Sequence, residues 1–206
     1  MTRLTRYCLI ICIALLTAAC AHKPGVTPPE NLREHQRQLQ AIAEWQLQGK
    51  LGIRTPDENG SASLKWTQEM ANYQLNLSGP LGQKRMIITG TPGKVQLEQT
   101  GEPAQEAKSP EALIKKQLGW TLPVTQLAYW VRGVPAPSGR INHIEQNSDG
   151  LIAQLQQGGW LISYSNYQDQ PFNHSTLAMP GRITAEYEDV RLILVIREWQ
   201  LGAVKN

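Results

Sequence analysis

Alternation of apolar and polar side chains along two long parts of the chain restricts the fold more than any other feature. Over residues 45–53, 62–66 and 73–77, apolar residues or glycine occupy every second position, with mainly polar residues between them. The pattern returns over residues 160–164 and 183–187. A period of two residues predicts β-strands with one buried face and one wet face. We therefore predict a sheet that must cover its apolar face or close upon it.

Short turn sequences separate these segments. Asn59-Gly60 is predicted to close the first hairpin, and Pro92-Gly93, Asp149-Gly150 and Gly158-Gly159 to close later ones. Glu188-Asp189 is expected to join the last two strands. Strands that follow one another through such tight turns run antiparallel, so the pattern predicts a meander.

Three segments favour helices. Thr27 is predicted to cap a first helix of about 15 residues, with Pro28 at its first position and Glu30 completing a capping box. Ser109-Pro110-Glu111 begins a second helix, and 123–132 reads as a third, ended by Gly133.

The polar stretches 101–108 and 166–179 are expected to be loops. Because the helical segments are few and short, they suit a lid better than a full layer. The predicted fold class is mainly β, an unclosed antiparallel β-barrel formed by one curved sheet. A short helical lid and an N-terminal helix complete it.

The first twenty residues have the composition of a secretory signal peptide. Arg3 and Arg6 precede an apolar run that is too short to span a bilayer, and small residues lead to Cys20. Small residues ending at a cysteine resemble a bacterial lipobox, in which the thiol is lipidated and the chain is cut before it. The alternative is an ordinary signal peptide with an incidental cysteine. We expect a signal peptide over 1–19, a lipidated tether over 20–29 and a single domain over 30–206.

No catalytic constellation stands out in the sequence. The histidines lack the spacing of metal ligands, and residues 90–94 lack the length and hydroxyl of a phosphate loop. The formal net charge is +3, and Arg3 and Arg6 of the leader contribute two of these charges. We therefore predict no metal site, no catalysis and no nucleic-acid partner.

The apolar face carries many aromatic side chains with a polar group. They are Trp45, Trp66, Tyr73, Trp160, Tyr164 and Tyr187, with Trp130 and Trp120 from the helical segments. Such groups need hydrogen-bond partners in a packed core, whereas a cavity open to water or lipid tolerates them. Both an aromatic core and a cavity remain open. The residues predicted to face the interior are Trp45, Leu47, Leu51, Trp66, Leu75, Trp130, Trp160 and Ile162.

Leu81 lies in the turn Gly79-Pro80-Leu81-Gly82, where polar residues are usual. It either folds back onto its own sheet or is held outward as an apolar probe for a bilayer or a partner's groove.

Several sequence segments, taken in order, resemble the LolB family of outer-membrane lipoprotein receptors. They are Trp45-Gln-Leu-Gln-Gly49-Lys-Leu, Asn76-Leu-Ser-Gly-Pro80-Leu81-Gly82, Leu127-Ala-Tyr-Trp130-Val-Arg-Gly133, Gly159-Trp160 with Ser163-Tyr164, Met179-Pro180 and Val195-Ile-Arg-Glu-Trp199. The likeness covers about residues 33–201. Ser78-Gly79 stands before Pro80 where the family pattern has Thr-Asn, and Thr17 stands where a lipobox more often has Leu.

The resemblance implies an open barrel with a helical lid around an apolar cavity. It implies a monomeric receptor that takes acylated lipoproteins from the periplasmic carrier LolA and releases them into the inner leaflet of the outer membrane. Pro80, Leu81 and Gly82 would form the membrane-insertion loop. Cys20 would carry N-acyl and S-diacylglycerol lipid, with no other cofactor. Ala21 follows Cys20 where enteric-type sorting uses Asp for retention in the inner membrane, so the resemblance implies the outer membrane.

Two rival functions belong to other classes. One is a structural outer-membrane lipoprotein with a packed barrel that binds another envelope protein. The other is a periplasmic hydrolase, which needs a convergent pair of acids or a nucleophile in the cavity. The volume and chemistry of the interior distinguish the three.

Overall fold

The computed structural model describes residues 26–57, 59–80, 84–118 and 122–202. Its helices are α2 (Leu32–Ala41), α3 (Pro110–Leu118) and α4 (Val124–Trp130). The strands of the N-terminal part are β1 (Glu44–Arg54), β2 (Asn59–Glu69), β3 (Asn72–Ser78), β4 (Arg85–Thr91), β5 (Lys94–Gln99) and β6 (Gln105–Ala107). Those of the C-terminal part are β7 (Ile141–Gln146), β8 (Ile152–Gln157), β9 (Trp160–Ser165), β10 (Gln168–Phe172), β11 (Ser175–Met179), β12 (Arg182–Tyr187) and β13 (Val190–Leu201).

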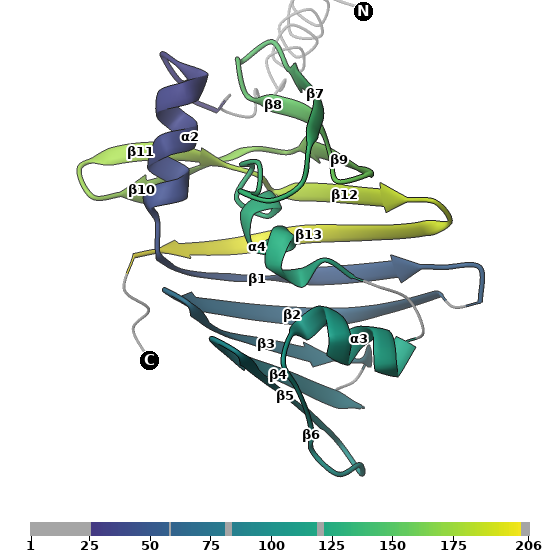
Figure 1. Ribbon diagram of the computed structural model, residues 1–206. Coiled ribbons are helices and arrows are strands. Elements are labelled where there is room, and N and C mark those ends of the chain that lie inside the picture. Colours follow the sequence, from purple (N-terminus) through teal and green to yellow (C-terminus); the bar gives the residue numbers. More distant parts are fainter. Residues whose placement is uncertain (1–25, 58, 81–83, 119–121, 203–206) are drawn as a thin grey trace, which may run out of the picture.

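Eleven strands form one antiparallel sheet in the order β6-β5-β4-β3-β2-β1-β13-β12-β9-β8-β7 (Figure 1). The end strands β6 and β7 do not pair with each other, so the sheet is curved but not closed. The predicted fold class, a mainly β open barrel with short helices, is confirmed.

The two halves of the sheet meet along β1 and β13. Their register places Leu51 opposite Leu194 and, after a shift between Gln48 and Gly49, Leu47 opposite Trp199. A Cβ atom on Gly49 would lie 2.2 Å from the carbonyl oxygen of Val195, so only glycine fits this bulge. Because β13 has one extra residue at the bulge, Trp199 points to the same buried face as Ile196, although the two are three positions apart.

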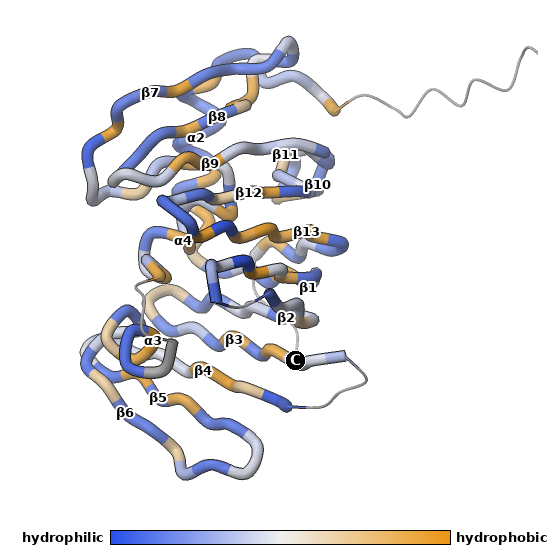
Figure 2. Tube along the Cα trace, turned by 90° about the vertical axis from the view of Figure 1, so that its right-hand side faces the viewer, coloured by the Kyte–Doolittle hydropathy of each residue, from blue (hydrophilic) through white to orange (hydrophobic). Residues whose placement is uncertain are grey.

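The helices α3 and α4 lie on the same side of the sheet (Figure 1). Figure 2 shows the strands stacked from β7 to β6, with apolar segments recurring along them. Buried residues of the strands and of these helices form one continuous core.

The first helix begins later than predicted. Its N-cap is Asn31, whose Oδ1 accepts hydrogen bonds from the backbone nitrogens of Arg33 and Glu34. The Thr27 hydroxyl is not a cap because it donates to Asp169 Oδ2 at 2.6 Å, and the Thr27 backbone N–H donates to the same carboxylate. This contact holds residue 27 against strand β10. The helix consequently has 10 residues rather than about 15.

Three turn and loop predictions also need correction. Asn59 and Gly60 pair with Arg54 and Ile53 as the first residues of β2, so they belong to the strand and not to the turn. The stretch 101–108 contains the short edge strand β6. The stretch 166–179 contains the hairpin of β10 and β11, two strands that pair with each other and form a separate small sheet. The turns at Pro92-Gly93, Asp149-Gly150, Gly158-Gly159 and Glu188-Asp189 are confirmed.

Candidate functional site

An apolar cavity of about 300 Å³ lies between the sheet and the helices α3 and α4. The described residues that line it come from seven strands, both helices and the loop ends beside them. They are Leu51, Ile53, Ala62, Leu64, Trp66, Leu75, Leu77, Gly79, Lys84, Met86, Ile88, Leu97, Leu113, Ile114, Leu122, Val124, Leu127, Val131, Ile183, Ala185, Leu192 and Leu194. A single charged group, the ammonium of Lys84, belongs to this set. A volume of about 300 Å³ lies at the lower end of the range for small-molecule sites.

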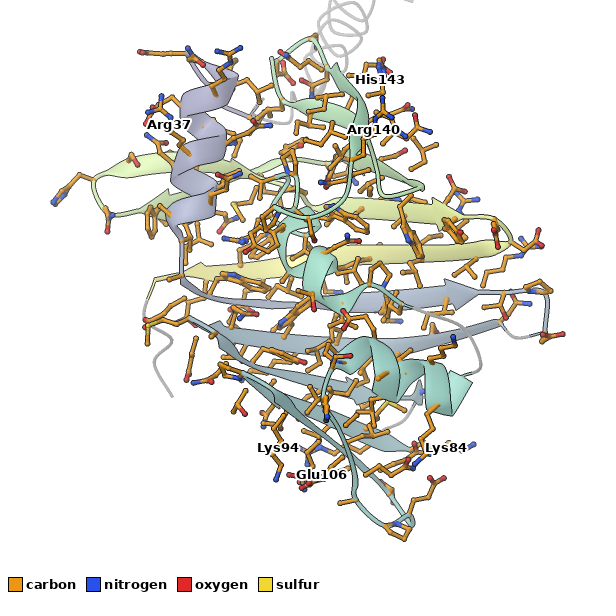
Figure 3. All side chains as sticks on the ribbon, viewed as in Figure 1. Arg37, Lys84, Lys94, Glu106, Arg140 and His143 are labelled. Atoms are coloured by element: carbon orange, nitrogen blue, oxygen red, sulfur yellow. The ribbon has the colours of Figure 1, made fainter. Side chains whose placement is uncertain are left out.

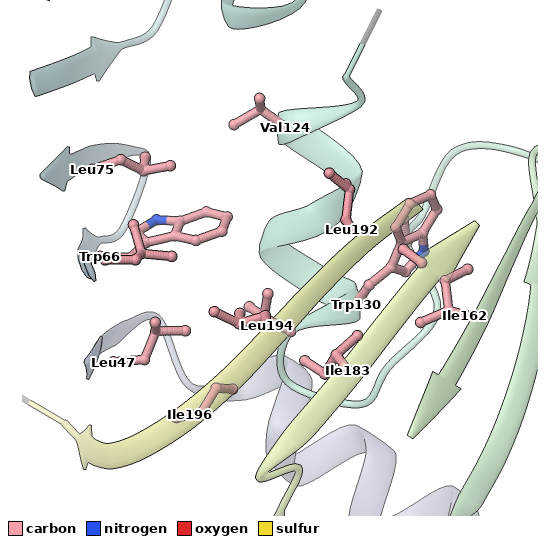
Figure 4. Packing of buried hydrophobic residues seen from close by; sticks show 14 of the residues in the cluster. Leu47, Trp66, Leu75, Val124, Trp130, Ile162, Ile183, Leu192, Leu194 and Ile196 are labelled. Carbon is pink, nitrogen blue, oxygen red and sulfur yellow. The ribbon is translucent and has the colours of Figure 1, made fainter. Parts of the chain in front are cut away.

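Strand pairing brings the lining residues together. Trp66 of β2 lies opposite Leu75 of β3, which lies opposite Ile88 of β4, and Ile88 lies opposite Leu97 of β5. Because side chains alternate between the two faces of a strand, directly paired residues point to the same face. The apolar row therefore continues across four strands, and Val124 of α4 faces it from the other side (Figure 4).

The half-buried lining residues of the strands gather at one rim of the cavity. They lie at the end of β1, the start of β2, the end of β3 and the start of β4: Leu51, Ile53, Ala62, Leu77 and Met86. Gly79 and Lys84, which bound the β3–β4 loop, line the cavity at the same rim. The cavity therefore opens where this loop begins, and Pro80 is exposed there.

Three of the eight residues predicted to face the interior line the cavity, namely Leu51, Trp66 and Leu75. The other five are buried outside the lining: Trp45, Leu47, Trp130, Trp160 and Ile162. Alternation identifies the inward face of a strand but not the position along it at which the covering helices leave a gap. Strand β1 illustrates this, because Leu47 is fully buried in the packed part and Leu51 borders the cavity.

Aromatic rings fill the packed part of the interior. Trp45 contacts Trp66 and Trp199, with ring centroids 5.2 and 5.7 Å apart. Trp130 contacts Trp160 at 6.1 Å, and Trp160 stacks at 5.4 Å on Tyr187, which is exposed at the edge of this part. Trp66 thus marks the boundary between the packed part and the cavity.

Gln157 fixes Trp130 in the packed part. Its Oε1 accepts from Trp130 Nε1 and from the Ala136 backbone N–H, both at 2.9 Å. Its Nε2 donates to the carbonyl oxygens of Ala136, Ser138 and Gly139 at 2.8 to 3.1 Å. The amide is fully buried and its hydrogen-bonding groups are satisfied, which allows a tryptophan to be buried without a water partner. Gln157 was not predicted from the sequence, because a glutamine on a strand is expected to face the solvent.

Arg132 joins α4 to the end of α2. Its Nη1 donates to the carbonyl oxygens of Leu39 and Ile42 at 2.9 Å each, and its Nε donates to Ala128 O at 3.0 Å. The guanidinium lies 5.1 Å from the ring centroid of Tyr129. Burial lowers the pKa of Arg132 from its ordinary value. A cation bound to the last carbonyls of a helix satisfies orphan acceptors and complements the helix dipole.

Some polar groups of the buried aromatic residues have a hydrogen-bond partner and others do not; Tyr164 Oη, outside the cavity lining, has none among the described residues. Trp199 Nε1 donates to Pro180 O at 3.0 Å in the packed part. Trp66 Nε1, beside the cavity, and Tyr73 Oη are buried without a hydrogen-bond partner among the described residues. Burial, helped by the carboxylate of Glu111, raises the pKa of Tyr73 to about 12, so this phenol stays neutral.

Cys20, Leu81, Gly82 and Trp120 lie outside the described residues, so the predictions about them stay predictions.

Sequence reasoning also missed lining residues from β12, β13 and α3. Their apolar character was visible, but only the tertiary packing brings Ile183, Leu192 and Ile114 to the same space.

Within the described ranges, no helix is long and apolar enough to cross a membrane. The same ranges bring together no group of three or more His, Cys, Asp or Glu side chains that could hold a metal ion.

Residues 43–199 match the family model described as Outer membrane lipoprotein LolB. The chain belongs to the LolB family. The outer-membrane lipoprotein LolB of Cellvibrio japonicus is 58% identical over 200 residues, which cover 95% of this chain and 98% of that protein. LolB of Stutzerimonas stutzeri is 41% identical over 196 residues, or 92% of each chain.

Solved structures agree on the fold. A LolA superfamily protein from Nitrosomonas europaea superposes with a TM-score of 0.50 at 10% identity, over 88% of this chain and 96% of that one. A putative outer membrane lipoprotein-sorting protein domain from Vibrio parahaemolyticus gives 0.50 at 6% identity, over 85% and 92% of the two chains. The LolB family and the LolA superfamily therefore share this open barrel.

Proposed function

We propose that this protein is a receptor anchored in the outer membrane that accepts lipoproteins by their acyl chains and inserts them into the inner leaflet. The observation that supports this most is the cavity, whose described lining is apolar except for Lys84 and the glycine at residue 79. An acyl chain gains about 0.8 kcal/mol for each methylene removed from water, and such a lining offers that gain.

The donor in this proposal is the periplasmic carrier LolA, and the receptor acts as a monomer. Transfer needs no nucleotide if chains bind more tightly to the receptor than to the donor, and less favourably than to a bilayer. The cavity rim beside the β3–β4 loop suits such a hand-over, because the opening and the loop lie together.

The anchor in this proposal is Cys20. Removal of the signal peptide 1–19 would leave the N-acyl and S-diacylglycerol lipid on this residue, and residues 20–29 would link it to domain 30–206. Thr27 is bound to Asp169, so the proposed tether is held to the domain at residue 27. The six residues 21–26 would then span at most about 20 Å.

The β3–β4 loop carries the proposed insertion step. Leu81, between Pro80 and Gly82, would enter the bilayer while the chains leave the cavity. Exposing a leucine side chain at a loop tip is unfavourable in water, and inserting it into hydrocarbon removes that free-energy cost.

The rival functions have less support. A structural lipoprotein with a packed barrel does not require a cavity whose rim is formed by half-buried apolar residues of four strands. A hydrolase requires paired acids or a nucleophile inside, whereas the charged group supplied by the described lining is Lys84.

The test is a transfer assay with an acylated lipoprotein on the soluble carrier, this protein, and outer-membrane vesicles. Leu81→Glu should keep cargo binding and lose delivery to the vesicles. Met70→Glu is the matched control, because Met70 is 69% exposed on the β2–β3 turn at the other end of β3. Normal delivery by Leu81→Glu would remove the loop from the mechanism, and absence of cargo uptake by the unchanged protein would refute the receptor.

A further inference from the structure

A polar hollow of about 710 Å³ lies on the face of the sheet opposite the cavity. Its described side chains come from β1, β2, β3, β4 and β13. They include Gln48, Lys65, Gln74, Asn76, Ser78, Arg85, Arg197 and Glu198. We call this set the outer basic hollow. Lys65 stands between Leu64 and Trp66 on β2, and these two neighbours line the cavity, so Lys65 points to the other face.

Strand register places the polar groups of the hollow in one row. Gln48 of β1 lies opposite Lys65 of β2, which lies opposite Asn76 of β3. On the other side of Gln48, the register shift in β13 leaves Arg197 as an extra residue beside Glu198, and both are exposed. Side chains directly opposite one another on paired strands lie within about 5.5 Å at their Cβ atoms.

Arg85 is oriented toward this row by hydrogen bonds. Its Nη2 donates to Asn76 Oδ1 at 3.3 Å, and Asn76 Nδ2 donates to Gln74 Oε1 at 2.9 Å. The guanidinium retains further donors beyond this contact, since arginine carries five N–H groups. A planar cation held in this way suits the oxygens of a phosphate.

The hollow has an excess of positive charge. Lys65, Arg85 and Arg197 face one acid, Glu198. The ion pairs found among the described residues involve other side chains: Arg37 with Glu34, Lys94 with Glu106 and Arg191 with Glu186. The three cations of the hollow therefore have no carboxylate partner within the described part of the chain and can take an anion.

The hollow adjoins the β3–β4 loop. Ser78 ends β3 immediately before Gly79, and Arg85 begins β4 immediately after Lys84. Asn76 is three residues from Gly79, or about 10 Å along the strand. The headgroup layer on each side of a bilayer is about 5 to 8 Å thick. With the tip of this loop in hydrocarbon, Arg85 at its base would lie at the level of the lipid phosphates, and the long side chains of Lys65 and Arg197 would reach toward that level.

We propose that the outer basic hollow binds the phosphate of an anionic lipid headgroup and so sets the angle at which the loop meets the bilayer. This inference rests on the proposed function, because it takes the β3–β4 loop as the part that enters the membrane. The cavity on the inner face of the sheet binds chains, and the outer face binds a headgroup. Binding on both faces would orient the sheet so that its edge, rather than one of its faces, meets the membrane surface.

The experiment measures flotation of the full chain carrying Cys20→Ser, which cannot be acylated, with vesicles and without cargo. Phosphatidylcholine vesicles are compared with vesicles that also contain phosphatidylglycerol. Lys65→Gln and Arg197→Gln should each weaken binding to the anionic vesicles about fivefold, and together about 25-fold. Binding to neutral vesicles should not change, and added salt should reduce the difference between the two lipids.

Arg140→Gln is the matched control. Arg140 is exposed and lies at the end of the molecule far from Lys84 (Figure 3). It should change binding less than twofold. Equal losses in Arg140→Gln and Lys65→Gln, or equal binding of the unchanged protein to both vesicles, would overturn the proposal.

A second arm separates a lipid headgroup from a free anion. Inorganic phosphate, added at the phosphate concentration of the vesicles, should leave the protein on the anionic vesicles. Full release by inorganic phosphate would show a small-anion site and overturn the lipid assignment. Because this assay contains no cargo, its failure leaves the receptor function standing. Failure of the receptor would show in the transfer assay instead.

Discussion

Arg132 Nη1 lies 2.9 Å from the carbonyl oxygen of Ile42, the residue that ends helix α2. This contact joins the helix that follows the N-terminal tether to the helix that covers the cavity. The same nitrogen also binds Leu39 O, so one buried cation satisfies two acceptors at the end of α2. The lid is therefore anchored to α2 through the residue that follows α4 closely in the chain.

Replacing Arg132 should destabilise the protein. Arg132→Met should lower the free energy of unfolding by about 3 kcal/mol, because hydrogen bonds to a charged group are lost and buried carbonyls are left without partners. Arg132→Lys should lose less, since an ammonium still reaches some of these carbonyls. The measurement is urea unfolding, with the slope m compared between variants. Arg140→Met, at an exposed site, should change stability by less than about 0.5 kcal/mol. A neutral Arg132→Met would contradict the role given to this contact.

Gln157 should be needed for the packed half of the interior. Gln157→Leu keeps an apolar core but removes the acceptor of Trp130 Nε1 and both partners of Ala136. Each buried group left unpaired costs about 1 to 3 kcal/mol, so the loss should be about 3 kcal/mol or more. Gln156→Leu is the control on the same strand, because Gln156 is exposed. Thermal unfolding distinguishes the two. Similar melting temperatures for both variants would show that the network contributes little.

His35 should make the stability depend on pH. It lies buried on α2 with Nε2 3.1 Å from Ala178 O, and burial lowers its pKa while this carbonyl partly opposes the shift. The unfolded chain, with an ordinary pKa near 6.5, then binds a proton more readily than the folded one. Stability from this group is present above pH 6.5. It should fall as the pH drops from 6.5 toward the lowered folded pKa.

The check is the unfolding free energy between pH 7.5 and 5. His35→Gln should flatten the slope near pH 6, whereas His143→Gln, at an exposed strand residue, should preserve it. A slope that persists unchanged in His35→Gln would assign the effect to other groups.

Filling the cavity should block acyl binding without unfolding the protein. Ala62 lies opposite Leu51 across β1 and β2, and both line the cavity. Ala62→Phe places a ring in existing space, so we expect a loss of at least tenfold in affinity for a fluorescent acyl probe and little loss of stability. Ala71→Phe makes the same change at an exposed turn and should bind the probe normally. Unimpaired binding by Ala62→Phe would place the chains elsewhere.

The order of the main strands follows from the sequence because alternation and turn residues are local signals. The hairpin of β12 and β13 and the helix that Ser109 begins are examples, and Ser109 Oγ accepts the Ala112 N–H at 3.2 Å as a cap should. The hairpin of β10 and β11 was missed because its residues do not alternate: β10 is mostly polar, and the apolar residues of β11 are consecutive, from Leu177 to Met179. Thr27 was misread because a distant carboxylate, Asp169, competes for its hydroxyl.

The candidate site could be predicted only in part, and the reason differs from the one that applies to the strands. Periodicity shows that Leu47, Leu51 and Trp66 share a face, but a cavity is a shortage of side chains in one place. It depends on where α3 and α4 cross the sheet. That in turn depends on long-range contacts such as those of Arg132 and Gln157, whose polar side chains gave no sign of burial.

Quenching by brominated acyl chains tests the central claim most directly, because it reports which tryptophan the chains approach. Trp66 lines the cavity, and Trp160 lies in the packed part against Trp130 and Tyr187. The account predicts that a brominated acyl probe quenches the unchanged protein, that Trp66→Phe removes most of the quenchable emission, and that Trp160→Phe leaves it in place. Quenching that survives Trp66→Phe and disappears in Trp160→Phe, or no quenching at all, would contradict a cavity that receives acyl chains.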